Sequence, residues 1–482
     1  MAGSLRCFRS ASLCALLALT AQAGVVSQAF AASDSERIRR LEAQLQQQQA
    51  VMREQQRMLE AMQAELQALT SDPAEVPTAA AAAAPAAEEP NAGAAPDNAL
   101  SLNVYGFAQA DMIYDFKRVD PNWNDTLRVT TIPTASGTYG DDGEFVFGVR
   151  QSRLGVKGNY GPDISFLLEA ELFGVGGDEG QTTPRLRHAW ATYKQFGMGQ
   201  YWSNFMDADI FPNTIDYWGP TGMVFYRNQQ ARFTFPMGGD ELSISLEDPS
   251  TALTVGRFRD LQFCDLPSPP PDCDSTVSTF GEQFQAHNDL PDITARYRSN
   301  GDYGHVQVAG IVRKLGYESL ATGNSEEEYG WGINTSAGLK TWGRDVLKLQ
   351  VVYGEGIGNY MNDGGVDIAP DSADISRASA ETVPLLGIVA YYDHYWNERW
   401  SSSVGWTMTD LDTRPGQADN EFAKGQLASV NLLHYPADNV MMGTELSWGE
   451  REDVSGDTGS DYRVQFSLKV GFDSGDLLQR AR

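Results

Sequence analysis

From residue 100 onward, the chain alternates apolar and polar residues over segments that are long for a strand. In 100–116, every even position is apolar or glycine, whereas the odd positions include Ser101, Asn103, Gln109, Asp111 and Asp115. Successive side chains of a strand point to opposite faces, and soluble strands have about 5–6 residues. The alternation returns at 164–172, 399–408, 440–448 and 462–472. Long strands with one apolar and one polar face are typical of outer-membrane β-barrels.

The connections between these segments alternate in length. Short links fall at 159–163, 194–197, 236–240, 299–302, 341–345, 397–398 and 436–439. Longer stretches occupy 117–143, 174–183, 203–230, 248–291, 314–330, 355–382, 409–423 and 450–461. Seven short and eight long connections imply sixteen strands, and the alternation matches the short periplasmic turns and long outer loops of outer-membrane barrels. We predict an all-β transmembrane fold, an antiparallel barrel of about 16 strands over residues 100–482; a large soluble β-sandwich or propeller is the alternative.

The first 99 residues follow other patterns. Residues 1–31 combine basic Arg6 and Arg9 with a short apolar core and small residues at 29 and 31, which predicts a secretory signal peptide. Residues 32–70 keep a seven-residue apolar register, which predicts a periplasmic coiled coil that oligomerises; one amphipathic helix docked on the main domain is the alternative. Residues 71–99 are rich in Pro and Ala and predict an extended linker.

Two cysteines remain after the signal peptide, Cys264 and Cys273, on either side of a Pro-rich segment. Disulfides are common in exported proteins, so we expect these two residues to form one. Their segment contains no histidine, and no spacing in the chain matches an EF-hand loop. We therefore expect neither a metal site nor a cofactor.

The chain has 36 basic and 64 acidic side chains, a net charge of −28. This balance excludes a nucleic-acid partner, because binding phosphates needs a basic face. Many acids fall in the predicted long loops, for example at 141–142, 326–328 and 452–453. Outside a cell, such loops can share divalent cations with lipopolysaccharide phosphates, although simple solvation explains them equally well. Outer-membrane lipids and lipopolysaccharide are the expected surroundings.

Basic residues fall on the polar face of the predicted strands. They include Arg153, Lys157, Arg185, Arg187, Arg296 and Arg298, and by this assignment luminal bases outnumber luminal acids. An arginine on the lipid face costs about 2–4 kcal/mol at the midplane, so these side chains should face water inside the barrel. Rings of Arg and Lys select anions, and Arg binds a carboxylate through two hydrogen bonds. The alternative is that they pair with Glu169, Glu171 and Asp292 and only hold the wall together.

Residues 200–236 contain a long stretch rich in aromatic side chains, namely Tyr201, Trp202, Phe205, Tyr217, Trp218 and Tyr226. A loop this apolar would not be left in water, so we expect it to fold into the barrel and narrow the pore. Arg227 and Arg232 would then lie at the constriction beside aromatic rings. That combination suits an aromatic or short organic carboxylate.

Together these segments resemble the DcaP-like family of trimeric outer-membrane porins of Gram-negative bacteria. The resemblance covers residues 34–472 and is carried by the N-terminal heptads, VYGFAQADMIYDF, RQSRLGVKG, LRHAWATYKQFGMGQYWSNFMD, GDELSISLEDPS and YGEGIGNY. It implies a trimer with a periplasmic coiled coil, uptake of dicarboxylates or aromatic dicarboxylates such as phthalate, and an anion path through Arg153, Arg187, Arg227 and Arg232. Phosphate-selective porins share part of this pattern. Such barrels usually end on an aromatic residue, which Phe472 matches, but residues 473–482 follow it.

We therefore expect a passive outer-membrane porin that prefers small organic anions and forms a homotrimer through barrel and coiled coil. A phosphate- or oxyanion-selective porin, and an envelope tether with a largely plugged barrel, are the alternatives. An enzyme such as a barrel phospholipase is not expected, because none of the five histidines lies in a recognisable catalytic motif.

Overall fold

The structure is a computed structural model that describes residues 100–262, 264, 279–320 and 323–475. The expected signal peptide, coiled coil and linker, at 1–31, 32–70 and 71–99, lie outside the described residues and stay predictions. Among the described helices, none is long and apolar enough to cross a membrane.

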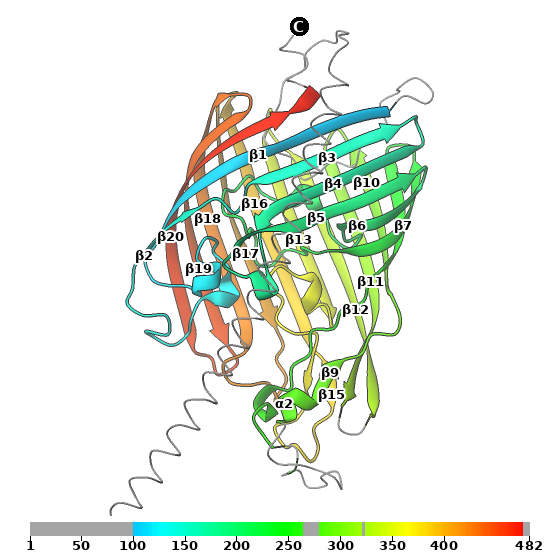
Figure 1. The fold of residues 1–482 in the computed structure, drawn as a ribbon, viewed down its shortest axis with the longest axis vertical. Helices are drawn as coiled ribbons and strands as arrows, with labels where there is room; N and C mark the ends of the chain where they lie inside the picture. Colours follow the sequence, from blue (N-terminus) through cyan, green and yellow to red (C-terminus); the bar gives the residue numbers. More distant parts are fainter. Residues whose placement is uncertain (1–99, 263, 265–278, 321–322, 476–482) are drawn as a thin grey trace, which may run out of the picture. The chain divides into compact units, whose positions relative to one another are not determined.

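Sixteen antiparallel strands of the described chain form one closed barrel (Figure 1). In chain order they are β1 (Leu100–Asp115), β3 (Arg153–Tyr160), β4 (Ile164–Phe173), β5 (Thr182–Tyr193), β6 (Phe196–Trp202), β7 (Arg227–Met237), β8 (Asp240–Glu247), β10 (Asp292–Gly301), β11 (Gly304–Ser319), β12 (Ser325–Lys340), β13 (Val346–Glu355), β16 (Pro384–Asn397), β17 (Trp400–Leu411), β18 (Phe422–Ala437), β19 (Val440–Asp453) and β20 (Thr458–Asp473). Each pairs with the next, and β20 pairs with β1 to close the barrel, with Val470 opposite Ala108. The predicted fold class and strand number of the barrel are confirmed.

Four shorter strands lie within the connections. β2 (Glu144–Gly148) pairs with the end of β1, and β9 (Phe284–Ala286) pairs with the end of β11. β14 (Ile368–Pro370) pairs with β15 (Ala380–Thr382), and the short helix α2 (Phe280–Gln283) directly precedes β9. The long connections therefore have secondary structure of their own.

Alternation along the strands sorts their side chains onto two faces of the barrel wall. In β11, Val308 and Val312 are about half exposed, whereas the neighbouring Gln307 and Arg313 are buried. In β1, Met112 is exposed and Asp111 is buried. Apolar side chains thus face outward and polar ones inward, as expected of a barrel surrounded by lipid.

All seven predicted short links are turns at one end of the barrel. The eight other connections join the barrel strands at the opposite end, and most of them are longer than these turns. Two of the predicted long stretches are shorter than expected. β11 and β12 pair as far as Glu318 and Ser325, and β19 and β20 as far as Glu452 and Thr458. The acidic residues 326–328 and 452–453 therefore lie in strands rather than in loops, because the ladder of backbone hydrogen bonds continues through these charged segments.

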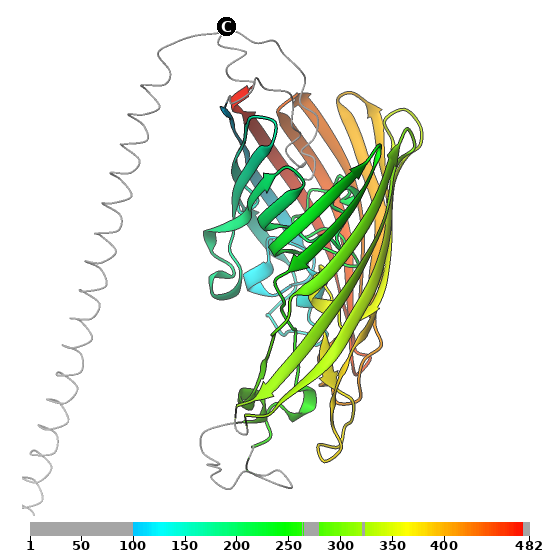
Figure 2. The same ribbon diagram turned by 90° about the vertical axis from the view of Figure 1, so that its right-hand side faces the viewer.

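The connection between β6 and β7 packs inside the barrel. We call residues 203–226 the constriction loop. Its side chains Phe205, Ile210 and Met223 are completely buried and share one apolar cluster with Val352 and Tyr391 of the barrel wall. Figure 2 shows the barrel from the side, with the long strands β11 and β12 in yellow-green. The loop thus narrows the lumen from within and packs its apolar side chains against the barrel wall.

Candidate functional site

Two buried glutamates organise the lumen face of β3, β4 and β5. Glu169 and Glu171 lie two residues apart on β4, so they share one face of the strand. Arg187 on β5 donates from Nε to Glu169 at 2.7 Å and from Nη1 to Glu171 at 2.6 Å. Arg153 on β3 lies 3.6 Å from each carboxylate, and Tyr105 on β1 donates to Glu169 at 2.7 Å.

Two further arginines approach Glu171. Arg185 ion-pairs with it directly, and Arg227, the first residue of β7, comes within 3.9 Å. Tyr217 of the constriction loop also donates to Glu171; burial, and then the Glu171 charge, raise the pKa of the Tyr217 hydroxyl, so it stays protonated. We call Arg153, Arg185, Arg187 and Arg227 the arginine cluster. The four arginines carry four positive charges, and Glu169 and Glu171 carry two negative charges. The group therefore has a net charge of +2.

A bulge in β5 places an additional residue beside Arg187. The register shifts there, so that Glu169 pairs with His188 while Ala170 pairs with Leu186. A bulge inserts one extra residue and re-aims a side chain. His188 is completely buried, and its ring centroid lies 5.0 Å from that of Trp202. Strict alternation assigns His188 to the outer face, so sequence reasoning missed it.

Aromatic rings hold several of these guanidinium groups. The Trp202 ring lies 5.5 Å from the Arg187 guanidinium carbon and 5.1 Å from that of Arg227. Arg232 on β7 lies over Tyr201 at 5.8 Å and donates to the Trp202 carbonyl. Tyr201 and Trp202 are the last residues of β6, so both belong to the wall beside the constriction loop.

The constriction loop is attached to the far side of the barrel by its main chain. Asn213 donates its backbone N–H to Asp393 of β16 at 3.2 Å. The backbone N–H groups of Ile215 and Asp216 donate to Glu445 of β19 at 3.0 and 3.3 Å. The loop therefore crosses from the β6–β7 wall to the β16–β19 wall and returns to the arginine cluster through Tyr217.

The remaining aromatic residues of the loop are distributed along this path. The Phe205 carbonyl accepts from Asn334 of β12 at 2.9 Å. The Trp218 ring packs edge-on against Trp123 at 5.1 Å, and the Tyr226 ring lies 4.8 Å from Tyr360. These contacts fix the course of the loop.

Arg296 and Arg298 are separate from the arginine cluster. Arg296 ion-pairs with Glu241, and Arg298 with Asp207 at 3.1 Å and with Asp209. The alternative role, holding the wall together, describes these two arginines best. Asp207 and Asp209 also form, with His305, a group whose ligand atoms lie within 4.8 Å of one another, but the Arg298 guanidinium already ion-pairs with both carboxylates.

Lys157 lies on the short-turn side of the cluster, with its Nζ 5.3 Å from the Tyr105 ring. Lys469 on β20 and Arg153 lie over the same Phe107 ring, at 5.4 and 5.3 Å. Neither lysine ion-pairs with a carboxylate of the described residues. Lys469 was not among the predicted site residues, although its polar-face position on β20 signals it.

The lumen as a whole is not basic. Arg463 of β20 is completely buried between Asp115, at 2.6 Å, and Asp216, at 3.2 Å. Further buried acids line the wall, including Asp111 and Glu445. Buried acids therefore accompany the luminal bases, and several of them, such as Asp111, Asp115 and Glu445, lie on the polar face of strands. Positive charge is instead concentrated around β3, β5 and β7.

Cys264 is disulfide-bonded. Its expected partner, Cys273, lies outside the described residues, and that pairing stays a prediction.

The comparisons with known proteins point to one family. Residues 87–248 match the DcaP outer membrane protein family. The predicted resemblance to the DcaP family is thereby confirmed. No curated protein matches the chain. Among solved structures, the outer membrane channel DcaP of Acinetobacter baumannii is 21% identical, with a TM-score of 0.61 over 79% of this chain and 99% of that one.

Two other solved barrels are more distant. An anion-selective porin from Comamonas acidovorans is 10% identical, with a TM-score of 0.44 over 78% of this chain and 100% of that one. OmpT of Vibrio cholerae is 9% identical, with a TM-score of 0.44 over 79% of this chain and 100% of that one.

Proposed function

We propose that this protein is an outer-membrane porin that lets small organic carboxylates diffuse passively and prefers anions over cations. The arginine cluster is the observation that carries the proposal. Its net charge of +2 lies on the wall to which Tyr217 of the constriction loop returns. A solute passing that point meets guanidinium groups that already have fixed orientations.

The chemistry of the cluster suits carboxylates. A guanidinium binds a carboxylate through two parallel hydrogen bonds, and its stacking on Trp202 leaves less side-chain entropy to be lost on binding. Glu169 and Glu171 moderate the attraction, because conduction requires binding that is strong enough for entry and weak enough for release. The neighbouring rings of Trp202 and Tyr217 favour aromatic carboxylates such as phthalate, the solute that the family resemblance implies.

A homotrimer in the outer membrane is part of the same proposal, with the coiled coil in the periplasm and lipopolysaccharide around the outer loops. The short strands along one wall of the barrel support a contact with a second copy of the chain there. β3, β6 and β8 have 8, 7 and 8 residues, against 16 in β11 and in β12. At a tilt of about 45° an eight-residue strand rises about 19 Å, less than the apolar band of about 25 Å. A second copy would cover the wall that these strands leave too short for lipid.

The reversal potential of the purified protein in a planar bilayer under a salt gradient tests the function. Anion preference is expected, and cation preference would overturn the proposal. Liposome swelling with succinate, phthalate, phosphate and arginine separates the alternatives. Faster entry of phosphate than of both carboxylates would favour an oxyanion porin, and zero conductance would favour a tether with a plugged barrel.

A further inference from the structure

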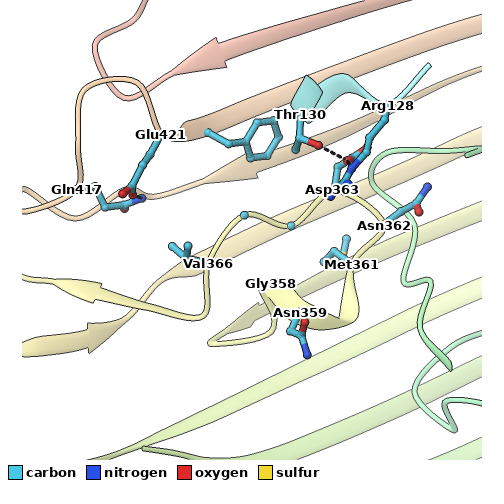
Figure 3. Close-up of a pocket in the computed structure, with 13 residues that line it drawn as sticks. Arg128, Thr130, Gly358, Asn359, Met361, Asn362, Asp363, Val366, Gln417 and Glu421 are labelled. Carbon is cyan, nitrogen blue, oxygen red and sulfur yellow. Dashed lines mark hydrogen bonds and ion pairs between the residues drawn. The ribbon is translucent and has the colours of Figure 1, made fainter. Parts of the chain in front are cut away.

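A polar cavity lies among the long loops, apart from the arginine cluster (Figure 3). It has a volume of about 340 Å³, which is in the range of small-molecule sites. Its lining comes from three connections: residues 128–130 after β1, residues 358–366 after β13, and residues 417–422 before and at the start of β18. These connections are long loops, so the cavity belongs to the end of the barrel opposite the short turns.

At one end of the cavity, Arg128 is held rigidly but keeps free donors. Its guanidinium packs against the adjoining rings of Trp123 and Trp218, at 4.8 and 4.5 Å from their centroids. Its Nε donates to Asp363 at 3.3 Å, and Asp363 is itself fixed by Thr130 at 2.8 Å. No described residue accepts a hydrogen bond from Nη1 or Nη2 of Arg128. This geometry leaves the fork of the guanidinium for a carboxylate.

At the other end of the cavity, Glu421 supplies negative charge. Its carboxylate accepts from Thr254 at 2.5 Å and from Gln417 at 3.1 Å, both neutral donors. No cation of the described residues ion-pairs with it. Figure 3 shows Glu421 and Gln417 on one side of the cavity and Arg128 with Thr130 and Asp363 on the other. Apolar side chains, Val366 and Phe422 among them, also line the cavity.

We propose that this cavity binds a zwitterion whose carboxylate and ammonium groups are several bonds apart, such as an ω-amino acid or a dipeptide. The carboxylate lies on the Arg128 fork, the ammonium group lies at Glu421, and the methylene or side-chain part packs on Val366 and Phe422. A dicarboxylate of equal length is disfavoured, because its second charge would meet Glu421 with no cation beside it. The inference goes beyond the proposed function, since it names a ligand class that the arginine cluster does not select.

Three six-carbon probes test the charge pattern at constant length: 6-aminohexanoate, adipate and 1,6-diaminohexane. Their affinities for the purified full-length protein are measured by isothermal titration calorimetry. We expect 6-aminohexanoate to bind at least about tenfold more tightly than either other probe. Equal affinities for 6-aminohexanoate and adipate would overturn the proposal.

Variants then test which residue binds the carboxylate and which binds the ammonium group of the ligand. Glu421→Gln should weaken 6-aminohexanoate about tenfold and strengthen adipate, while Arg128→Gln should weaken both. Arg128→Lys keeps the charge without the fork and should recover only part of the affinity, which keeps the test informative if Arg128→Gln fails to fold. Arg377→Gln is the matched control, because Arg377 is exposed, pairs with Asp374 and does not line the cavity. Unchanged binding in Glu421→Gln would overturn the proposal.

Reversal potentials of the same variants keep the two proposals apart. Cation preference in the wild-type protein would remove the anion-porin proposal and leave zwitterion binding to be judged by calorimetry alone.

Discussion

The side chains of the arginine cluster differ in how tightly they are held. This difference indicates which arginine stabilises the fold and which one can bind a passing anion. Arg187 is buried and bridges Glu169 and Glu171 at 2.7 and 2.6 Å. Arg227 comes only within 3.9 Å of Glu171 and stacks on Trp202. The first arginine therefore completes the wall, whereas the second has hydrogen-bonding capacity left for a passing anion.

Replacing Arg227 by glutamine should lower anion selectivity and leave the barrel folded, because Arg153, Arg185 and Arg187 still neutralise the two glutamates. Reversal potentials measure the selectivity, and the heat-dependent shift of the barrel on a gel reports its folding. If the double variant Arg227→Gln/Arg232→Gln kept the wild-type reversal potential, β7 would have no part in the anion path.

Replacing Arg187 by glutamine should act on stability instead. Removing one partner of a buried hydrogen bond costs about 1–3 kcal/mol, and the loss stays in this range because Arg153 and Arg185 still lie against the two carboxylates. Urea unfolding of the refolded protein in detergent measures the loss. A second change, Glu169→Gln, should restore part of it; an Arg187→Gln variant as stable as the wild type would contradict this assignment.

Among the elements, the constriction loop depends on close backbone contact with the wall. Gly222 lies against β16 and β17: a Cβ at this position would be 2.0 Å from the carbonyl oxygen of Met408 and 2.7 Å from that of Ile388. Its N–H donates to Thr407 at 2.8 Å. Only a residue without a side chain allows the loop to approach so closely.

Gly222→Ala should therefore push the constriction loop away from β16 and β17 and change single-channel conductance. Backbone atoms cannot give way cheaply at such distances, so we also expect a lower unfolding midpoint in urea. Gly310→Ala on β11 is the control, because the atom nearest to its new Cβ would be 3.9 Å away. Equal conductance and stability in both variants would show that the loop does not need this contact.

The barrel elements were predictable from the sequence, whereas the contacts of the constriction loop were not. Period-two alternation and turn residues are local, so they give the strands, their faces and the seven short turns. The partners of Asn213 and Ile215 on β16 and β19 are far away in the chain, and no local pattern reports them. The bulge at His188 and the guanidinium stacking of Arg128 depend on register and on loop packing, so alternation alone missed both.

For the whole molecule, the unequal strand lengths suggest that one wall meets protein and the other meets lipid. The short strands β3, β6 and β8 carry exposed apolar side chains such as Met198, just as the long strand β11 carries Val312. In Figures 1 and 2, β3 to β7 cover less of the barrel height than β11 and β12.

Met198→Arg should therefore dissociate the proposed trimer without unfolding the barrel, because a charge would be buried between copies. Val312→Arg should instead cost about 2–4 kcal/mol of folding free energy in a bilayer and leave the oligomer intact, because it faces lipid. Light scattering after size exclusion measures the oligomer, and unfolding in urea measures stability. A trimer that survives Met198→Arg would place the contact on another wall.

The attachment of the constriction loop through its backbone has a consequence for how such a channel can diversify. Asp393 and Glu445 hold main-chain N–H groups of Asn213, Ile215 and Asp216, which every residue except proline possesses. These two carboxylates therefore fix the course of the main chain whichever side chains stand there, whereas the Asp216 carboxylate must stay, because it pairs with buried Arg463. Selection in nature, or a designer building a filter for a new solute, can therefore change side chains beside Asp216 while the main chain of the loop keeps its course.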